Sequence, residues 1–162
     1  MIDAGGPNGM TSSLAVVTTG SDREIDLLET AADFSRCRDS ALLVLRLASS
    51  DEYEQVAETM ETIGEVEHTS YGADDIRAGL TDDARKAVAE ETAGRNLSTD
   101  VLLRVIEDDE RADAILEVAR ENDCDHVFLV GQRRSPTGKA LFGDVTQKVI
   151  LNFDGEITLS MD

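Results

Sequence analysis

Residues 14–19 read Leu-Ala-Val-Val-Thr-Thr and end at Gly20, a short apolar and β-branched stretch typical of a strand buried on both faces. Ser21 or Asp22 follows and can cap a helix, because a short oxygen side chain accepts from the free N–H groups of the first turn. Apolar residues then recur at helical spacing up to Arg38. The members of this stripe are Ile25, Leu28, Ala31 and Ala32, with Ser35. The chain therefore opens with a strand followed by a helix.

The same alternation continues to the end of the chain. Further strands are predicted at residues 41–48, 100–106 and 126–130, and a fifth where Ile157, Leu159 and Met161 alternate. Helices are predicted at residues 51–63, 81–93, 109–122 and 141–152, with a short extended piece at residues 65–71. This pattern predicts an α/β fold: an open five-stranded parallel sheet with helices on both faces, Rossmann-like in type.

The chain has 162 residues, which is the length of a single domain. Residues 1–13, rich in Gly, Asn, Ser and Pro, are expected to form a flexible N-terminal tail, and residues 14–162 the domain. No apolar run approaches the roughly 20 residues that cross a bilayer, and no basic start precedes an apolar block. We therefore expect a cytoplasmic protein without membrane insertion.

Charge is the most unusual property of the sequence. Asp and Glu total 34 against 15 Lys and Arg, and the net charge is -19. The only lysines are Lys86, Lys139 and Lys148. This balance excludes a nucleic-acid binder that works by broad phosphate neutralisation, and it opposes docking on an anionic membrane. The absence of Trp argues further against base stacking.

An acidic, lysine-poor surface is typical of halophilic proteins from salt-loving archaea. Salt near ~1 M shortens the Debye length to about 3 Å and removes the self-repulsion of such a surface. An ordinary acidic protein from a mesophile is the alternative, and the scarcity of lysine favours the halophile.

Metal and catalytic groupings are hard to find in the sequence. Cys37 and Cys124 have no C-x-x-C spacing, and their apolar surroundings predict two buried free thiols. His68 and His126 lack a second ligand nearby. The acidic run at residues 107–110 could bind a divalent cation, but such runs are more often solvated loops or first helical turns. No spacing suggests a Ser-His-Asp or Cys-His site, so we expect no catalytic residues, no metal and no enzyme activity.

Ligands of open α/β sheets bind beyond the carboxyl ends of the strands, where the strand order reverses. The loop after Val130 is the most unusual of those at that edge. It reads Gly-Gln-Arg-Arg-Ser-Pro-Thr-Gly-Lys over residues 131–139 and leads to Gly143 at a predicted helix N-terminus. A glycine-rich approach to a helix N-terminus suits an anion, because free N–H groups and the helix dipole point outward. Two interpretations of this loop remain open: a pocket for phosphate, or a surface loop whose arginines offset the negative charge of nearby acids.

Residues 115–149 carry a recognisable pattern. The strand Cys-Asp-His-Val-Phe-Leu-Val-Gly at residues 124–131, then Gly143 followed by Val145, resembles the C-terminal half of universal stress protein domains, which have an adenine-nucleotide α-hydrolase-like fold. Thr19-Gly20-Ser21 is similar to the family's D-G-S. Residues 42–47 lie where the family has its second strand. The resemblance covers most of the chain from residue 14 and is weakest over residues 51–79. The sequence R-S-P-T-G-K-x-x-F-G at residues 134–143 resembles that of haloarchaeal members of the family.

The resemblance implies a set of cofactor-binding positions for ATP or another adenine nucleotide. These are Thr18, Thr19, Gly20, Leu47, Gly131, Arg133, Arg134, Gly138, Lys139, Gly143, Asp144 and Val145. The chain departs from nucleotide-binding members at several of them. Thr19 replaces an Asp, Arg134 replaces the second Gly of G-x-x-G, and Asp144 replaces Ser or Thr. The usual Gly after the third strand is Glu107 or Asp108.

These departures predict a degenerate site. The Asp144 carboxylate lies where a phosphate would sit and is a good N-cap itself, so an empty site is self-consistent. Arg133, Arg134 and Lys139 could still grip a phosphate by another route, Arg through its bidentate fork.

The sequence therefore predicts a small binding or regulatory module of the stress response. The alternative is an ATP-binding member that hydrolyses or senses ATP slowly. An enzyme of the wider adenine-nucleotide α-hydrolase-like group has no support in the catalytic loops. A protein partner is possible, and we expect a homodimer through the alternating C-terminal strand, since an apolar edge invites a second strand. Asp154, Glu156 and Asp162 are acids that oppose this pairing.

Overall fold

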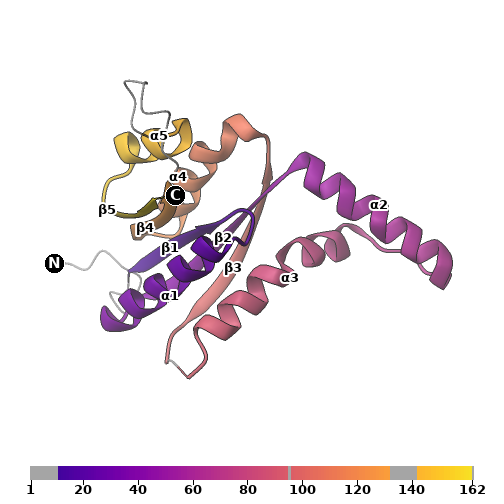
Figure 1. Cartoon of the computed structure of the whole chain (residues 1–162), viewed down its shortest axis with the longest axis horizontal. Coiled ribbons are helices and arrows are strands. Elements are labelled where there is room, and N and C mark those ends of the chain that lie inside the picture. The colour runs from indigo at the N-terminus through magenta and orange to yellow at the C-terminus, as the bar shows by residue number, and fades with distance from the viewer. Residues whose placement is uncertain (1–10, 95, 132–141, 162) are drawn as a thin grey trace.

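The computed structural model describes residues 11–94, 96–131 and 142–161 (Figure 1). Its strands are β1 (Ser12–Val17), β2 (Ala41–Ser49), β3 (Thr99–Ile106), β4 (Cys124–Gly131) and β5 (Glu156–Met161). Its helices are α1 (Asp22–Cys37), α2 (Ser50–Glu67), α3 (Ala73–Glu91), α4 (Arg111–Glu121) and α5 (Asp144–Asn152), with a 3-10 turn η1 (Asp108–Glu110) before α4.

The five strands form one parallel sheet in the order β3-β2-β1-β4-β5. The chain runs outward from β1 to β3, crosses back to place β4 beside β1, and ends on β5. The predicted fold class is thus confirmed. The strand order reverses between β1 and β4, so the connections that follow these two strands diverge and leave a crevice at their carboxyl ends.

Both faces of the sheet are covered. Val127 and Leu129 of β4 belong to the core under α4 and α5, whereas Phe128 belongs to the core under α1 and α3. This alternation follows from the two-residue period of a strand, and it explains why the central strands are apolar throughout. None of the helices in the described ranges is long and apolar enough to cross a membrane.

The start of the chain differs slightly from the prediction. Ser12 and Ser13 belong to β1, whereas the sequence placed them in the tail, and Ser13 is fully buried. Thr18 and Thr19, predicted as strand, follow its end in a bend. β-Branched Thr suits a strand, but here both residues turn to meet the next helix. Residues 1–10 lie outside the described residues.

The stretch between β2 and β3 contains the largest errors. The predicted extended piece at residues 65–71 is wrong, because α2 continues to Glu67 and ends at His68, whose φ is 57°. The helix predicted from residue 81 begins at Ala73, with Gly72 as its cap and the Asp75 carboxylate accepting from the Gly72 N–H at 2.9 Å. Apart from Ile76, which packs against the small core of Ala48, Leu80 and Leu103, residues 65–79 are exposed, so they lack the apolar period on which the prediction relied.

Two further details also differ. Cys37, predicted to be buried, is exposed, while Cys124 is buried as expected. Cys37 lies two residues beyond the buried Ser35, and two residues rotate about 200° around a helix, away from the core. The last helix, predicted to begin at residue 141, begins at Asp144. Phe142 and Gly143 precede it, and residue 141 lies outside the described part of the chain.

Candidate functional site

A cleft of about 460 Å³ lies at the carboxyl ends of β1, β2 and β4, between the N-termini of α1, α4 and α5. It is lined by Val16, Thr18, Thr19, Ser21, Glu24, Leu47, Arg111, Ile115, Leu129, Val130, Gly143, Asp144, Val145 and Thr146. Its position is the crevice that the reversal of strand order creates, where ligands of such sheets bind.

The turn between β1 and α1 forms one wall of this cleft, and a buried carboxylate occupies it. Glu24 is 5% exposed. Its two carboxylate oxygens accept from the backbone N–H groups of Thr18 at 2.8 Å, Thr19 at 2.9 Å and Gly20 at 2.7 Å. The Thr18 hydroxyl donates at 2.8 Å and the Thr19 hydroxyl at 3.4 Å. Successive N–H groups of this kind form an anion-binding concavity, and Glu24 fills it from within the chain.

The local sequence explains this arrangement. Ser21 is the N-cap of α1, and its hydroxyl accepts from the Glu24 N–H at 3.3 Å. Ser21 and Glu24 thus match the S-x-x-E pattern of a capping box, in which the acid reaches back toward the cap. Here the carboxylate reaches past the cap, to the residues that precede it. Our sequence analysis missed Glu24, although this pattern would have pointed to it.

A second carboxylate lies across the cleft at the start of α5. Gly143 is the N-cap of that helix, and Asp144 is its first residue, so the prediction that Asp144 itself would be the cap is wrong. Glycine is a tolerated cap, and an acid in the first turn still interacts favourably with the helix dipole. Among the described lining residues, Arg111 is the cation, and it pairs with Asp108 at 3.1 Å.

The structure brings together half of the predicted cofactor positions around the cleft: Thr18, Thr19, Leu47, Gly143, Asp144 and Val145. Gly20 lies beside them with its N–H donated to Glu24. Gly131 is not among the residues that line the cleft, and a Cβ there would lie 3.0 Å from the Met161 sulfur of β5, so this flexible side chain would have to shift slightly. Arg133, Arg134, Gly138 and Lys139 lie outside the described residues. The binding role of all these positions remains a prediction.

The histidine and cysteine of β4 have structural surroundings. His126 lies against the rings of Phe34 and Phe128, and its Nε2 is 2.7 Å from the Thr158 hydroxyl of β5. Burial lowers the pKa of His126. Burial, helped by the neighbouring aspartates, raises the pKa of Cys124 to about 12, so this thiol stays protonated. In the described ranges, no group of three or more His, Cys, Asp or Glu residues is placed to hold a metal ion.

Comparisons with known proteins agree with this architecture. The model of the universal stress protein family matches residues 10–158. A universal stress protein from Archaeoglobus fulgidus is 22% identical, with a TM-score of 0.58 over 93% of this chain and 97% of that one. The universal stress protein from Archaeoglobus fulgidus in complex with dAMP is 19% identical, with a TM-score of 0.56 over 93% and 96%.

A universal stress protein in complex with cAMP is 15% identical, with a TM-score of 0.54 over 94% of this chain and 97% of that one. At these identities the solved structures show a shared fold. No curated protein matches the sequence.

Proposed function

Because the chain belongs to the universal stress protein family, we propose that it is a small stress-associated binding or regulatory module with a degenerate nucleotide site. One observation carries this proposal. The N–H groups that would approach an anionic ligand at the end of β1 already donate to the Glu24 carboxylate.

A phosphate would have to displace Glu24 to use this turn. Glu24 is almost fully buried, and displacement would take its charge away from several donors at once. A buried charge without partners is costly, so the exchange is unfavourable even before the ligand's own charge is considered.

The charge around the cleft adds to this cost. Glu24 and Asp144 are carboxylates on opposite walls, and Arg111 already pairs with Asp108. A triphosphate therefore meets more negative than positive charge among the described lining residues. High salt screens this repulsion from exposed groups but acts little on a buried carboxylate.

The nucleotide content of the protein tests the proposal. Protein purified in high KCl is denatured with acid, and the released small molecules are identified by mass spectrometry. A known nucleotide-binding universal stress protein, purified in parallel, serves as the positive control. We expect no stoichiometric nucleotide from this chain, and a stoichiometric adenine nucleotide would contradict the proposal.

A second candidate function is an ATP-binding or other adenine-nucleotide-binding module with slow hydrolysis or sensing. The cleft favours it, because it is open and has an apolar wall from Val16, Leu47 and Leu129 that suits a base. Two of the similar structures hold dAMP and cAMP. In this case Arg133 and Arg134 would hold the phosphate, and the variant with both changed to Ala would lose nucleotide affinity.

The setting of the protein is part of the same proposal. We propose a haloarchaeal type of universal stress protein that works in the cytoplasm, on the basis of the net charge of -19 and the scarcity of lysine. We also propose a homodimer through β5, which lies at the edge of the described sheet. Ile157 and Leu159 already pack against the core on one face, so the free edge of β5 is held in an extended form that a second copy can pair with.

A further inference from the structure

Helices α2 and α3, with the turn that joins them, form an arm that projects beyond the sheet (Figure 1). The buried residues of α3 are Leu80, Thr81, Ala84 and Val88, which all lie beyond its first two turns. α2 buries only Gly64. The outer half of the arm therefore lies outside the two main cores of the domain.

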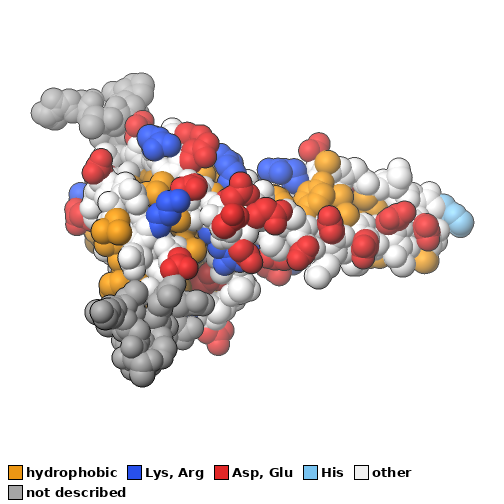
Figure 2. Space-filling view, turned by 90° about the horizontal axis from the view of Figure 1, so that it is seen from above, with side chains coloured by type: hydrophobic (Ala, Val, Ile, Leu, Met, Phe, Trp, Pro, Cys, Tyr) orange, Lys and Arg blue, Asp and Glu red, His pale blue; other side chains and the backbone are white. Residues whose placement is uncertain are grey.

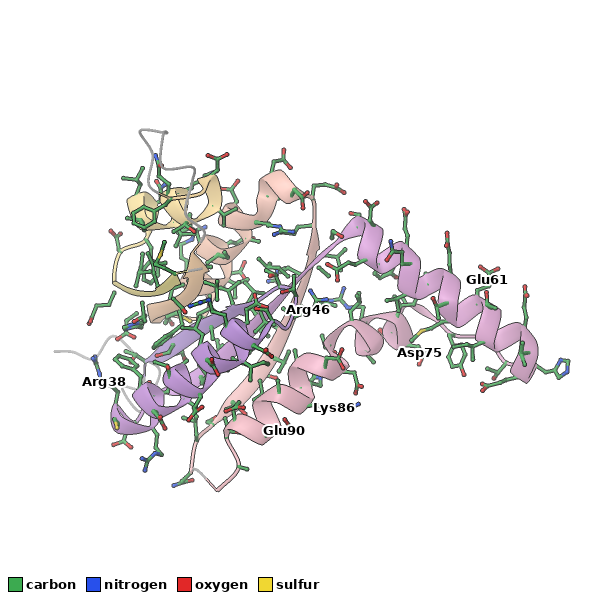
Figure 3. The ribbon with its side chains drawn as sticks, viewed as in Figure 1. Arg38, Arg46, Glu61, Asp75, Lys86 and Glu90 are labelled. Carbon is green, nitrogen blue, oxygen red and sulfur yellow. The ribbon has the colours of Figure 1, made fainter. Side chains whose placement is uncertain are left out.

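The arm nevertheless has a defined structure. Arg46 of β2 lies at the base of the arm (Figure 3). It pairs with Glu52 in the first turn of α2 at 2.6 Å, which ties the arm to the sheet. At the tip, the Thr69 N–H donates to the Gly64 carbonyl at 2.8 Å, and a Cβ on Gly64 would come within 2.5 Å of the Thr69 carbonyl oxygen. The Tyr71 hydroxyl donates to Glu67 at 2.8 Å.

The exposed surface of α2 is divided into two stripes. The acidic stripe consists of Asp51, Glu54, Glu58, Glu61 and Glu65, whose spacing of three and four residues places them on one face. The uncharged stripe beside it consists of Gln55, Thr59, Thr62, Ile63 and Val66, which are all exposed. α2 contains no lysine or arginine.

The uncharged stripe is unusual for this protein, in which 30% of residues are charged. Ile63 is 43% exposed and Val66 is 77% exposed. The Thr59 and Thr62 hydroxyls donate to backbone carbonyls of α2, so burial of these side chains would leave no donor unpaired. Figure 2 shows apolar side chains exposed along the arm with acidic side chains beside them.

We propose that the uncharged stripe of α2 is a docking surface for a basic amphipathic helix of a partner protein. Apolar residues of that helix would pack on Ile63 and Val66, and its Lys and Arg residues would meet the acidic stripe. Protein–protein interfaces commonly have few charges at their centre and polar or charged residues at their rim, and the two stripes of α2 would match this arrangement. The surface is separate from the cleft between β1 and β4, so the proposal is independent of any nucleotide.

Charge decides between this partner and a second copy of the chain. Two copies that paired antiparallel through α2 would bring their acidic stripes to the same side of the interface. Like charges brought together in this way are unfavourable, whereas Lys and Arg at those positions are attracted.

Binding of a designed peptide tests the surface. The probe is a fluorescein-labelled helical peptide with a leucine stripe flanked by lysines. A second peptide has the same composition in an order that breaks the stripe. Fluorescence anisotropy is measured at the lowest KCl concentration that keeps the protein folded and again at about 1 M KCl, where the Debye length is about 3 Å. We expect the striped peptide to bind more tightly than the scrambled one, and more weakly as salt rises.

Two pairs of variants locate the binding. The I63S/V66S variant should weaken binding of the striped peptide by about tenfold or more, because a few residues buried at the centre of an interface carry most of its affinity. Leu151→Ser is the matched control, since Leu151 is 72% exposed on α5. The E58Q/E61Q variant should reduce the salt dependence of binding, whereas the E29Q/E117Q variant, with the same change in charge on α1 and α4, should not.

Three results would overturn the proposal. The first is equal affinity for the two peptides, because binding would then depend only on the attraction between a basic peptide and an acidic protein. The second is unchanged affinity in I63S/V66S with its melting temperature unchanged. The third is a light-scattering mass that falls in I63S/V66S without peptide, which would make the stripe a contact between copies of this chain.

Discussion

The carboxylate of Glu24 accepts hydrogen bonds from both the backbone N–H and the hydroxyl of Thr18, each at 2.8 Å. Thr18 is one of the residues that the family resemblance assigns to a cofactor. In this chain both of its donors are directed to an acid in the next helix. The end of β1 therefore binds an anion that belongs to the protein itself, which is the observation behind the degenerate site that we propose.

Replacing Glu24 with Gln should destabilise the fold. The amide keeps one acceptor oxygen and places an NH2 group against N–H donors, so several hydrogen bonds are lost in a buried position. We expect a loss of about 1–3 kcal/mol in the free energy of unfolding, measured by urea denaturation in high KCl. The control is Glu29→Gln, an exposed position on the same helix. Equal stability of the two variants would contradict the role given to Glu24.

Sequence patterns were sufficient for the sheet, because the strands are apolar on both faces and short. They did not reveal the occupant of the turn after β1. Glu24 looks like an ordinary acid in the first turn of a helix, and only the bend at Thr18 and Thr19 brings three N–H groups to it. The capping-box pattern with Ser21 was visible, but the reach of the carboxylate beyond the cap depends on backbone geometry.

The free energy of unfolding should rise with pH as His126 loses its proton. Its pKa is lowered by burial, with smaller effects from Glu156 and Asp125, which raise it, and from Arg38, which lowers it. The unfolded chain thus takes up a proton at a higher pH than the folded chain does. The contribution of His126 is complete above the ordinary pKa of about 6.5 and is lost as pH falls through it toward the folded value.

Melting curves against pH at constant salt test this expectation. His126→Asn should lower the melting temperature at neutral pH, and its curve should be flatter than that of the wild type below about pH 6.5. His68→Asn, at an exposed position, is the control. Parallel curves for His126→Asn and the wild type would show that His126 does not contribute to the pH dependence.

Folding should require salt. The net charge is -19, and exposed carboxylates repel one another at low ionic strength. Between about 0.1 M and 1 M salt the Debye length falls from about 10 Å to about 3 Å, which removes most of this repulsion. Circular-dichroism melts across a series of KCl concentrations should show a rising midpoint, and a midpoint independent of salt would refute the interpretation of the charge.

In solution the protein should be a dimer through β5. Light scattering in high KCl should give a mass near twice the 17.5 kDa of one chain. Leu159→Ala should weaken the dimer, while Leu151→Ala on α5 should not. Leu159 also packs against the core, so the melting temperature of the variant is measured beside its mass. A wild-type mass of one chain would end the dimer proposal.

The end of α2 and the start of α3 could not be placed from the sequence, for a physical reason. Residues 65–71 are exposed, and Ile76 is the one partly buried residue among residues 73–79, so no apolar period marks these turns. Gly72 is the N-cap of α3, and its N–H donates to the Asp75 carboxylate, a contact that no apolar pattern marks. The same lack of packing leaves the uncharged stripe of α2 exposed.

Calorimetric titration with Mg-ATP in high KCl measures whether a nucleotide can use the turn after β1. We expect no heat of binding for the wild type, because Glu24 holds the N–H groups that phosphate would need. A dissociation constant in the low micromolar range would contradict it and would direct attention to Arg133, Arg134 and Lys139 as the residues that hold the phosphate.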